Sequence, residues 1–201
     1  MTRAAADAER VASAAGPEGF PKAGVPEIAL LGRSNVGKSS LLNRLVGRRK
    51  LAFASSKPGT TRLLHFYRVE RAGRALLLVD LPGYGFARVS RAERGRWRAL
   101  VEGYLHGRPA LRGCVLLQDL RRDVSDDELD LLAWLAERGV PVRVALTKSD
   151  QLAASPRRAR TAALVAAFGL PPEHVIATSA RSGEGMADLW RALDPLVRRE
   201  G

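Results

Sequence analysis

The sequence of 201 residues has one cysteine, few aromatic residues and no long apolar run. A lone Cys114 excludes a disulfide framework within the chain and a zinc cluster built on cysteines, and it fits a reducing compartment. No apolar stretch approaches the ~18 residues that a membrane-spanning helix needs. The first residues include Asp7 and Glu9 and lack the apolar segment of a secretory signal. We therefore expect a cytoplasmic protein with no membrane span.

Acidic residues are also few relative to basic ones. The chain has 21 Asp and Glu and 33 Lys and Arg, which gives a net charge of +12. Such an excess predicts an anionic partner, such as nucleic acid, nucleotide or an acidic membrane surface, although a well-solvated surface gives the same composition. The excess is local. Residues 41–122 hold 18 basic and 5 acidic residues, whereas the rest of the chain holds 15 and 16.

Short apolar runs of strand type alternate with stretches of helical spacing. The strand-type runs are 28–31, 63–69, 75–80, 114–119, 142–147 and 175–178, and the helical stretches are 38–45, 90–105, 126–137, 156–168 and 186–197. The alternation predicts an α/β fold with a mostly parallel six-stranded sheet and helices on both faces. Residues 70–74 are too few for a crossover helix, so the second and third runs should form a hairpin that adds one antiparallel edge strand. Residues 1–20 are expected to be a loosely ordered extension, and 21–201 one domain.

The segment from Gly32 to Ser39 reads GRSNVGKS and satisfies the pattern G-x-x-x-x-G-K-[ST]. It follows an expected strand and begins an expected helix, where backbone N–H groups bind phosphate oxygens. Lys38 can place its charge on the β- and γ-phosphates, and the Ser39 hydroxyl can ligate Mg²⁺. The expected nucleotide contacts are Gly32, Arg33, Ser34, Asn35, Val36, Gly37, Lys38, Ser39 and Ser40. A glycine-rich turn that caps a helix is the alternative interpretation.

Two further loops are expected near the phosphates. Asp80 ends an apolar strand within the sequence DLPG, so its carboxylate can hold Mg²⁺ and the Gly83 N–H can meet a γ-phosphate. In the upstream loop KPGTTR, Thr61 can cap the metal only when a γ-phosphate is present, as in an order–disorder switch. These loops add Gly59, Thr60, Thr61, Asp80, Leu81, Pro82 and Gly83 to the nucleotide contacts. The expected metal ligands are Ser39, Thr61 and Asp80, and the expected catalytic residues are Lys38, Thr61 and Gly83.

A base pocket is expected at the ends of the last two strands. The Asp150 carboxylate in TKSD can accept hydrogen bonds from the N1–H and 2-amino groups of guanine, whereas adenine would leave it unpaired. The Ala180 N–H in TSA can donate to guanine O6. The expected base contacts are Thr147, Lys148, Asp150, Thr178, Ser179 and Ala180. The ligand predicted from these motifs is GTP or GDP.

Taken in order, the five motifs resemble those of the translation-factor-related GTPases. The details resemble the EngB (YihA/YsxC) family, within the TrmE-Era-EngA-EngB-like P-loop GTPases. The segments that carry this resemblance are GRSNVGKSSLLN, SSKPGTTR, DLPGYGFA, QDLRR and LTKSD. The resemblance implies a Ras-like domain, hydrolysis of GTP to GDP and a role in assembly of the large ribosomal subunit. It also implies a ribosomal or rRNA partner and a link to cell division and septation. We expect a monomer.

Tyr84 occupies the position where small signalling GTPases place a glutamine that orients the attacking water. A phenol lacks the paired donor and acceptor of a carboxamide, so we expect slow intrinsic turnover that a partner or a cation accelerates. In related GTPases with a G-x-x-N-x-G-K-S loop, the Asn helps to hold K⁺, which suggests K⁺ beside Asn35. A loop-stabilising hydrogen bond is the alternative role. The alternative function is an RNA-binding or division-protein-binding module that GTP regulates, with negligible catalysis.

The stretch 88–98 is the candidate RNA-facing surface. On a helix, Arg91, Arg94 and Arg98 share one face, with Trp97 beside them. A solvated helix face is the alternative interpretation, because arginines are common on exposed helices.

The Asp150→Asn substitution tests the base pocket. It should weaken GTP binding by on the order of 10³-fold, because an amide cannot accept two hydrogen bonds from guanine as a carboxylate does. The same variant should gain affinity for xanthosine nucleotides, whose C2 carbonyl accepts from the amide. Fluorescence titration with both nucleotides measures the exchange. Normal GTP affinity in the variant would show that the pocket is misassigned.

Overall fold

The computed structural model describes residues 7–52, 63–84 and 91–198, and within 91–98 it describes the backbone but not the side chains. Its strands are β1 (Asp7–Ala14), β2 (Glu27–Gly32), β3 (Leu64–Arg71), β4 (Arg74–Asp80), β5 (Leu111–Asp119), β6 (Val142–Thr147) and β7 (Val175–Ala177). Its α-helices are α1 (Lys38–Leu45), α2 (Arg91–His106), α3 (Asp126–Glu137), α4 (Ala154–Phe168) and α5 (Met186–Arg198). Short 3₁₀ turns lie at Pro17–Gly19, Ser149–Gln151 and Pro172–His174.

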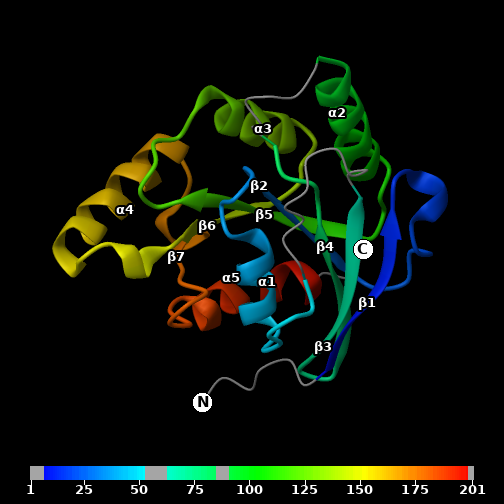
Figure 1. Cartoon of the computed structure of the whole chain (residues 1–201), viewed down its shortest axis with the longest axis horizontal. Coiled ribbons are helices and arrows are strands. Elements are labelled where there is room, and N and C mark those ends of the chain that lie inside the picture. The colour runs from blue at the N-terminus through cyan, green and yellow to red at the C-terminus, as the bar shows by residue number, and fades with distance from the viewer. Residues whose placement is uncertain (1–6, 53–62, 85–90, 199–201) are drawn as a thin grey trace.

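The strands form one sheet of order β1-β3-β4-β2-β5-β6-β7, with helices on both faces (Figure 1). Strand β2 shows why both faces are covered, since successive side chains of a strand point to opposite faces. Ile28 and Leu30 pack in a core cluster with residues of α1 and α5. Ala29 and Leu31 pack in a second cluster with residues of α2, α3 and α4. The predicted α/β fold with a mostly parallel sheet is confirmed.

The described part of the sheet has seven strands where the sequence predicted six. Strands β3 and β4 form the expected antiparallel hairpin, but β1 pairs antiparallel with β3 from Asp7↔Glu70 to Ala14↔Leu64. Strand β3 is therefore the second strand from the edge, and β1 is the edge strand. The expectation of a loosely ordered extension over residues 1–20 is wrong for residues 7–14.

The sequence of β1 explains why the prediction missed it. DAERVASA is rich in Ala and charged residues, which are depleted in strands, so it lacks a strand signal of its own. Strand β1 is stabilised instead by hydrogen bonds to backbone groups of β3 that would otherwise be left unpaired at the edge of the sheet. Side chains add contacts, because Ala8 and Ala14 are buried and Ser13 Oγ lies 2.8 Å from His65 Nδ1 in a hydrogen bond. Tertiary pairing therefore overrides local propensity.

A buried carboxylate joins β2 to the end of α2. Glu27 is fully buried and accepts hydrogen bonds from Arg108 Nε at 2.9 Å, Arg108 Nη2 at 2.6 Å and Tyr104 Oη at 2.8 Å. Arg108 Nη2 also donates to the Pro21 carbonyl at 2.7 Å. Burial, followed by the charge of Glu27, raises the pKa of Tyr104 well above its usual value. The group fixes one end of α2 against the sheet. Among the described residues, no helix is long and apolar enough to cross a membrane.

The Glu27→Gln substitution should lower the free energy of unfolding by about 3 kcal/mol, because it leaves the buried Arg108 guanidinium without a counter-charge. Urea unfolding at neutral pH measures the loss. Glu70→Gln is the matched control, since Glu70 forms an ion pair with Arg68 in which both side chains are about two-fifths exposed. The control should change stability by less than about 1 kcal/mol. Equal losses in the two variants would contradict the role of Glu27.

Candidate functional site

Four of the predicted motifs meet where the parallel strands β2, β4, β6 and β7 reach their carboxyl ends (Figure 1). Loops at the carboxyl ends of parallel strands are where α/β proteins bind ligands. An open cavity of about 960 Å³ lies at this edge, and its lining includes Gly37, Ser40, Lys148, Asp150 and Ala180. The structure therefore brings the phosphate loop and the base motifs to the same cavity.

The backbone of the phosphate loop has the open conformation that glycine permits. Gly37 has a φ of 104° at the residue before α1, a region that side chains disfavour. A Cβ on Gly32 would lie 2.9 Å from Val36 Cγ1 and 3.1 Å from the Leu117 carbonyl oxygen, so any other residue there would displace its neighbours. Asn35 also has a left-handed backbone, with a φ of 64°.

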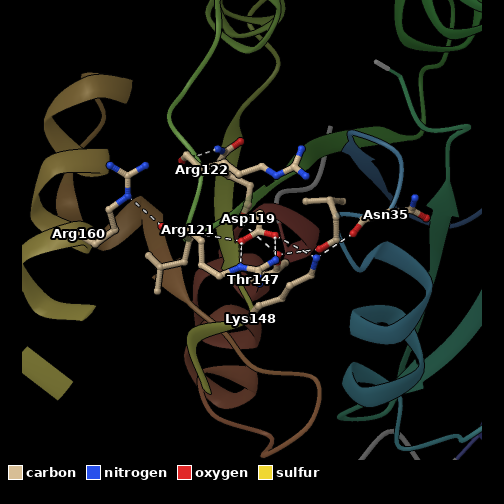
Figure 2. Close-up of polar contacts among 10 residues, drawn as sticks. Asn35, Asp119, Arg121, Arg122, Thr147, Lys148 and Arg160 are labelled. Carbon is tan, nitrogen blue, oxygen red and sulfur yellow. Dashed lines mark hydrogen bonds and ion pairs between the residues drawn. The ribbon is translucent and has the colours of Figure 1, made fainter. Parts of the chain in front are cut away.

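Side chains from β6 and from the residue after it contact this loop (Figure 2). Thr147 Oγ1 donates to the Val36 carbonyl at 2.7 Å, and Lys148 Nζ donates to the Asn35 carbonyl at 3.0 Å. These contacts cross more than a hundred residues of sequence. The same TKSD motif that was predicted for the base thus also supports the phosphate loop.

The predicted phosphate ligand and the predicted metal ligand contact one another. Lys38 Nζ and the Asp80 carboxylate form an ion pair in which both side chains are mostly buried. Among the described residues, no group of three or more His, Cys, Asp and Glu could hold a metal by itself. The Ser39 hydroxyl and the Asp80 carboxylate fit Mg²⁺, which takes oxygen ligands and usually uses one or two carboxylates together with phosphate oxygens.

The DLPG loop lies directly against the phosphate loop. Ser34 N donates to the Tyr84 carbonyl at 2.9 Å, and Tyr84 N donates to the Gly32 carbonyl at 3.3 Å. A Cβ on Gly83 would lie 3.1 Å from Ser34 Oγ and 3.2 Å from Ser34 N, which is tighter than ordinary contact. Glycine at position 83 therefore allows the close approach of the two loops.

Sequence reasoning missed Glu128, a buried carboxylate beside this contact. Glu128 forms a capping box with Ser125 at the start of α3, and its Oε2 accepts from Ser125 N at 2.9 Å. Arg33 Nη1 of the phosphate loop lies 3.8 Å from Glu128 Oε1 and donates to Ser125 Oγ at 3.2 Å. Burial and the adjacent Glu128 raise the pKa of Tyr84 far above its usual value. The pattern S-x-x-E at 125–128 signals a helix start and gave no sign of this second role.

The base motifs hold the Asp150 carboxylate in place. Ser179 Oγ donates to Asp150 Oδ1 at 2.6 Å, and Ser182 N donates to Ser179 Oγ at 3.0 Å. Asp150 is exposed to the cavity while Ser179 is fully buried. Glu184, which sequence reasoning also missed, accepts from Ser149 Oγ at 2.9 Å. The carboxylate predicted to recognise guanine is thus oriented by neighbouring hydroxyls.

The structure does not describe several of the predicted site residues or their side chains. Gly59, Thr60 and Thr61 are outside the described residues. The backbone of 91–98 belongs to α2, as predicted, but the side chains of Arg91, Arg94, Trp97 and Arg98 are not described. His65 lies on β3, where burial lowers its pKa against an opposing effect of Asp80. Its hydrogen bond with Ser13 ties it to strand β1.

Comparisons with known proteins agree with this geometry. A family model described as 50S ribosome-binding GTPase matches residues 27–148. The chain is 45% identical to the probable GTP-binding protein EngB of Gemmatimonas aurantiaca, over 88% of the chain and 85% of that protein. It is 41% identical to the protein of the same name from an Exiguobacterium species, over 94% and 95%.

Solved structures show the same fold. A crystal structure of a probable GTP-binding protein engB is similar with a TM-score of 0.68 and 24% identity, over 87% of this chain and all of that one. A structure of Era in complex with MgGDPNP and a segment of 16S ribosomal RNA is similar with a TM-score of 0.67 and 20% identity, over 88% of this chain and 58% of that one.

Proposed function

Because the chain belongs to the EngB family of GTPases, we propose that it acts as a nucleotide switch in assembly of the large ribosomal subunit. The proposal includes a link to normal cell division and septation, a cytoplasmic location and a monomeric state. The observation that carries it is the meeting of the phosphate loop and the Asp150–Ser179 pair at one cavity. Phosphates and a guanine base can be bound together only where both groups of residues face the same space.

Different residues would bind the phosphates, the base and the metal ion. The backbone of Gly32–Ser39 and the N-terminus of α1 would bind the phosphates, and Lys38 would place its charge on the β- and γ-oxygens. Asp150, oriented by Ser179, would accept from the guanine N–H groups. Ser39 and Asp80, with Thr61, would hold a Mg²⁺ ion, which neutralises charge on the β- and γ-phosphates.

Nucleotide binding would rearrange one contact of the described structure. Lys38 and Asp80 neutralise one another here, so Lys38 would turn from Asp80 to reach phosphate oxygens. Asp80 is the last residue of β4, and the loop after it reaches Tyr84, which hydrogen-bonds to the phosphate loop through its backbone. A change at Asp80 would therefore act next to the contact between the two loops.

Intrinsic hydrolysis should be slow, because Tyr84 cannot orient water as a glutamine does. Its phenol is buried next to Glu128, at the start of α3. The same observation favours the second candidate, a GTP-regulated RNA-binding or division-protein-binding module with negligible catalysis. Stimulation of turnover by large-subunit particles would favour the switch over the module.

Co-sedimentation with large ribosomal subunits tests the proposed function. Binding should be stronger with a non-hydrolysable GTP analogue than with GDP, and it should fall steeply as salt rises, because contacts to phosphates depend on salt. Asp150→Asn provides the control, since its binding should follow the xanthosine analogue in place of the guanosine one. Sedimentation that ignores the nucleotide, or its absence under every condition, would contradict the ribosomal role.

Turnover in K⁺ and in Na⁺ at matched ionic strength tests a cation site beside Asn35. In Figure 2 the Asn35 side chain points away from Lys148, whereas its carbonyl accepts the lysine hydrogen bond. K⁺ should raise the rate by about tenfold or more, because a fixed charge near the transferring phosphate stabilises the transition state. Asn35→Ala should remove the difference between the two ions. Equal turnover of the unaltered protein in both salts would contradict the K⁺ site.

A further inference from the structure

A buried carboxylate at the end of β5 contacts two cations. Asp119 is 4% exposed. Arg121 grips both of its oxygens, from Nε to Oδ1 at 2.8 Å and from Nη2 to Oδ2 at 2.6 Å, and Arg121 N donates to Oδ1 at 3.1 Å. Lys148 Nζ donates to Oδ2 at 3.0 Å (Figure 2). Asp119 thus joins the loop after β5 to the TKSD motif after β6.

The carboxylate stays charged although it is buried. Burial alone would raise the pKa of Asp119, but the hydrogen bonds from Arg121 and Lys148 outweigh it and hold the pKa well below its usual value. Asp119 is therefore charged at neutral pH. Its neutral isostere would leave Arg121 and Lys148 close together without a counter-charge.

Lys148 connects this charge to the phosphate loop. The same ammonium that donates to Asp119 also donates to the Asn35 carbonyl at 3.0 Å. Lys148 has a φ of 64°, a left-handed conformation that is uncommon for residues other than Gly, Asn and Asp. Its conformation therefore depends on the contacts of its surroundings, and Asp119 fixes the side chain that links it to Asn35.

We propose that Asp119 is a positioning residue for nucleotide retention, which acts through Lys148 to hold Asn35 and the phosphate loop in the conformation that binds phosphates. Asp119 itself lies outside the lining of the cavity. The inference rests on the proposed placement of the nucleotide at the phosphate loop. It extends the binding machinery to a strand end that none of the nucleotide motifs includes.

A second ion pair in the same loop supplies a matched control. Asp123 Oδ1 lies 2.7 Å from Arg160 Nη2 of α4, and the Asp123 side chain is 91% exposed. Arg160 also donates from Nε to the Leu120 carbonyl at 3.0 Å, so the pair stabilises the loop without contact to Lys148. Asp123→Asn removes a charge of the same kind, four residues from Asp119, while the link to the phosphate loop stays intact.

Dissociation of a fluorescent GDP analogue, followed by stopped flow with excess unlabelled GDP, tests the proposal. Asp119→Asn should speed dissociation by about tenfold, whereas Asp123→Asn should stay within about twofold of the unaltered protein. Asp119→Glu, which restores the charge, should release GDP more slowly than Asp119→Asn does. Lys148→Met should speed dissociation as well, and Asp119→Asn should add nothing to it in the double variant.

The possible results separate the inference from the proposed function. If the unaltered protein retains GDP but Asp119→Asn releases it at the same rate, or accelerates release equally in the Lys148→Met background, the inference is wrong. If Asp119→Asn does not fold, an unchanged rate in Lys148→Met alone overturns it. If the unaltered protein binds no guanine nucleotide, the proposed site itself fails.

Discussion

The phosphate loop depends on support from outside itself, and that support organises the rest of the site. Between the end of β2 and the start of α1 the backbone leaves regular pairing, as a loop that is to present N–H groups to an anion must. Val36 and Asn35 therefore offer their carbonyls to Thr147 and Lys148, which lie at the end of a different strand. Because these contacts already order the loop, it loses less conformational entropy on binding phosphate than a free loop would.

The ion pair of the phosphate loop with β4 makes the site able to respond to a nucleotide. Lys38 and Asp80 satisfy each other in the described structure, and a buried charge that lost its partner without gaining another would be costly. Under the proposed function, a nucleotide with Mg²⁺ would offer both charges new partners at once, so the exchange would not leave either charge buried alone. Because Asp80 ends β4, the exchange would act on the loop that runs to Tyr84, whose backbone is hydrogen-bonded to Ser34 and Gly32 of the phosphate loop.

The sequence predicted the parts of the site that depend on local chemistry, and it missed the parts that depend on distant contacts. The phosphate loop, the DLPG loop and TKSD lie at the ends of β2, β4 and β6, as the sequence predicted, because strand ends and glycine patterns fix them locally. Strand β1 was missed because its partner, β3, lies more than fifty residues away and its own residues disfavour strands. Glu128 and Asp119 look like a helix cap and a strand end, and only the fold brings them to Arg33 and Lys148.

The uneven charge of the chain gains meaning from this arrangement. Residues 41–122 contain the excess of basic residues, and the same stretch contains both candidate switch loops, β3, β4 and α2. The motifs predicted to bind the base lie outside this stretch in sequence but not in space, because Arg44, Arg48 and Arg49 line the same cavity as Asp150. An anionic partner that the basic stretch attracts would therefore approach the segment that holds both candidate switch loops. Under the proposed function, a change in the DLPG loop would then couple the nucleotide to docking without direct contact between them.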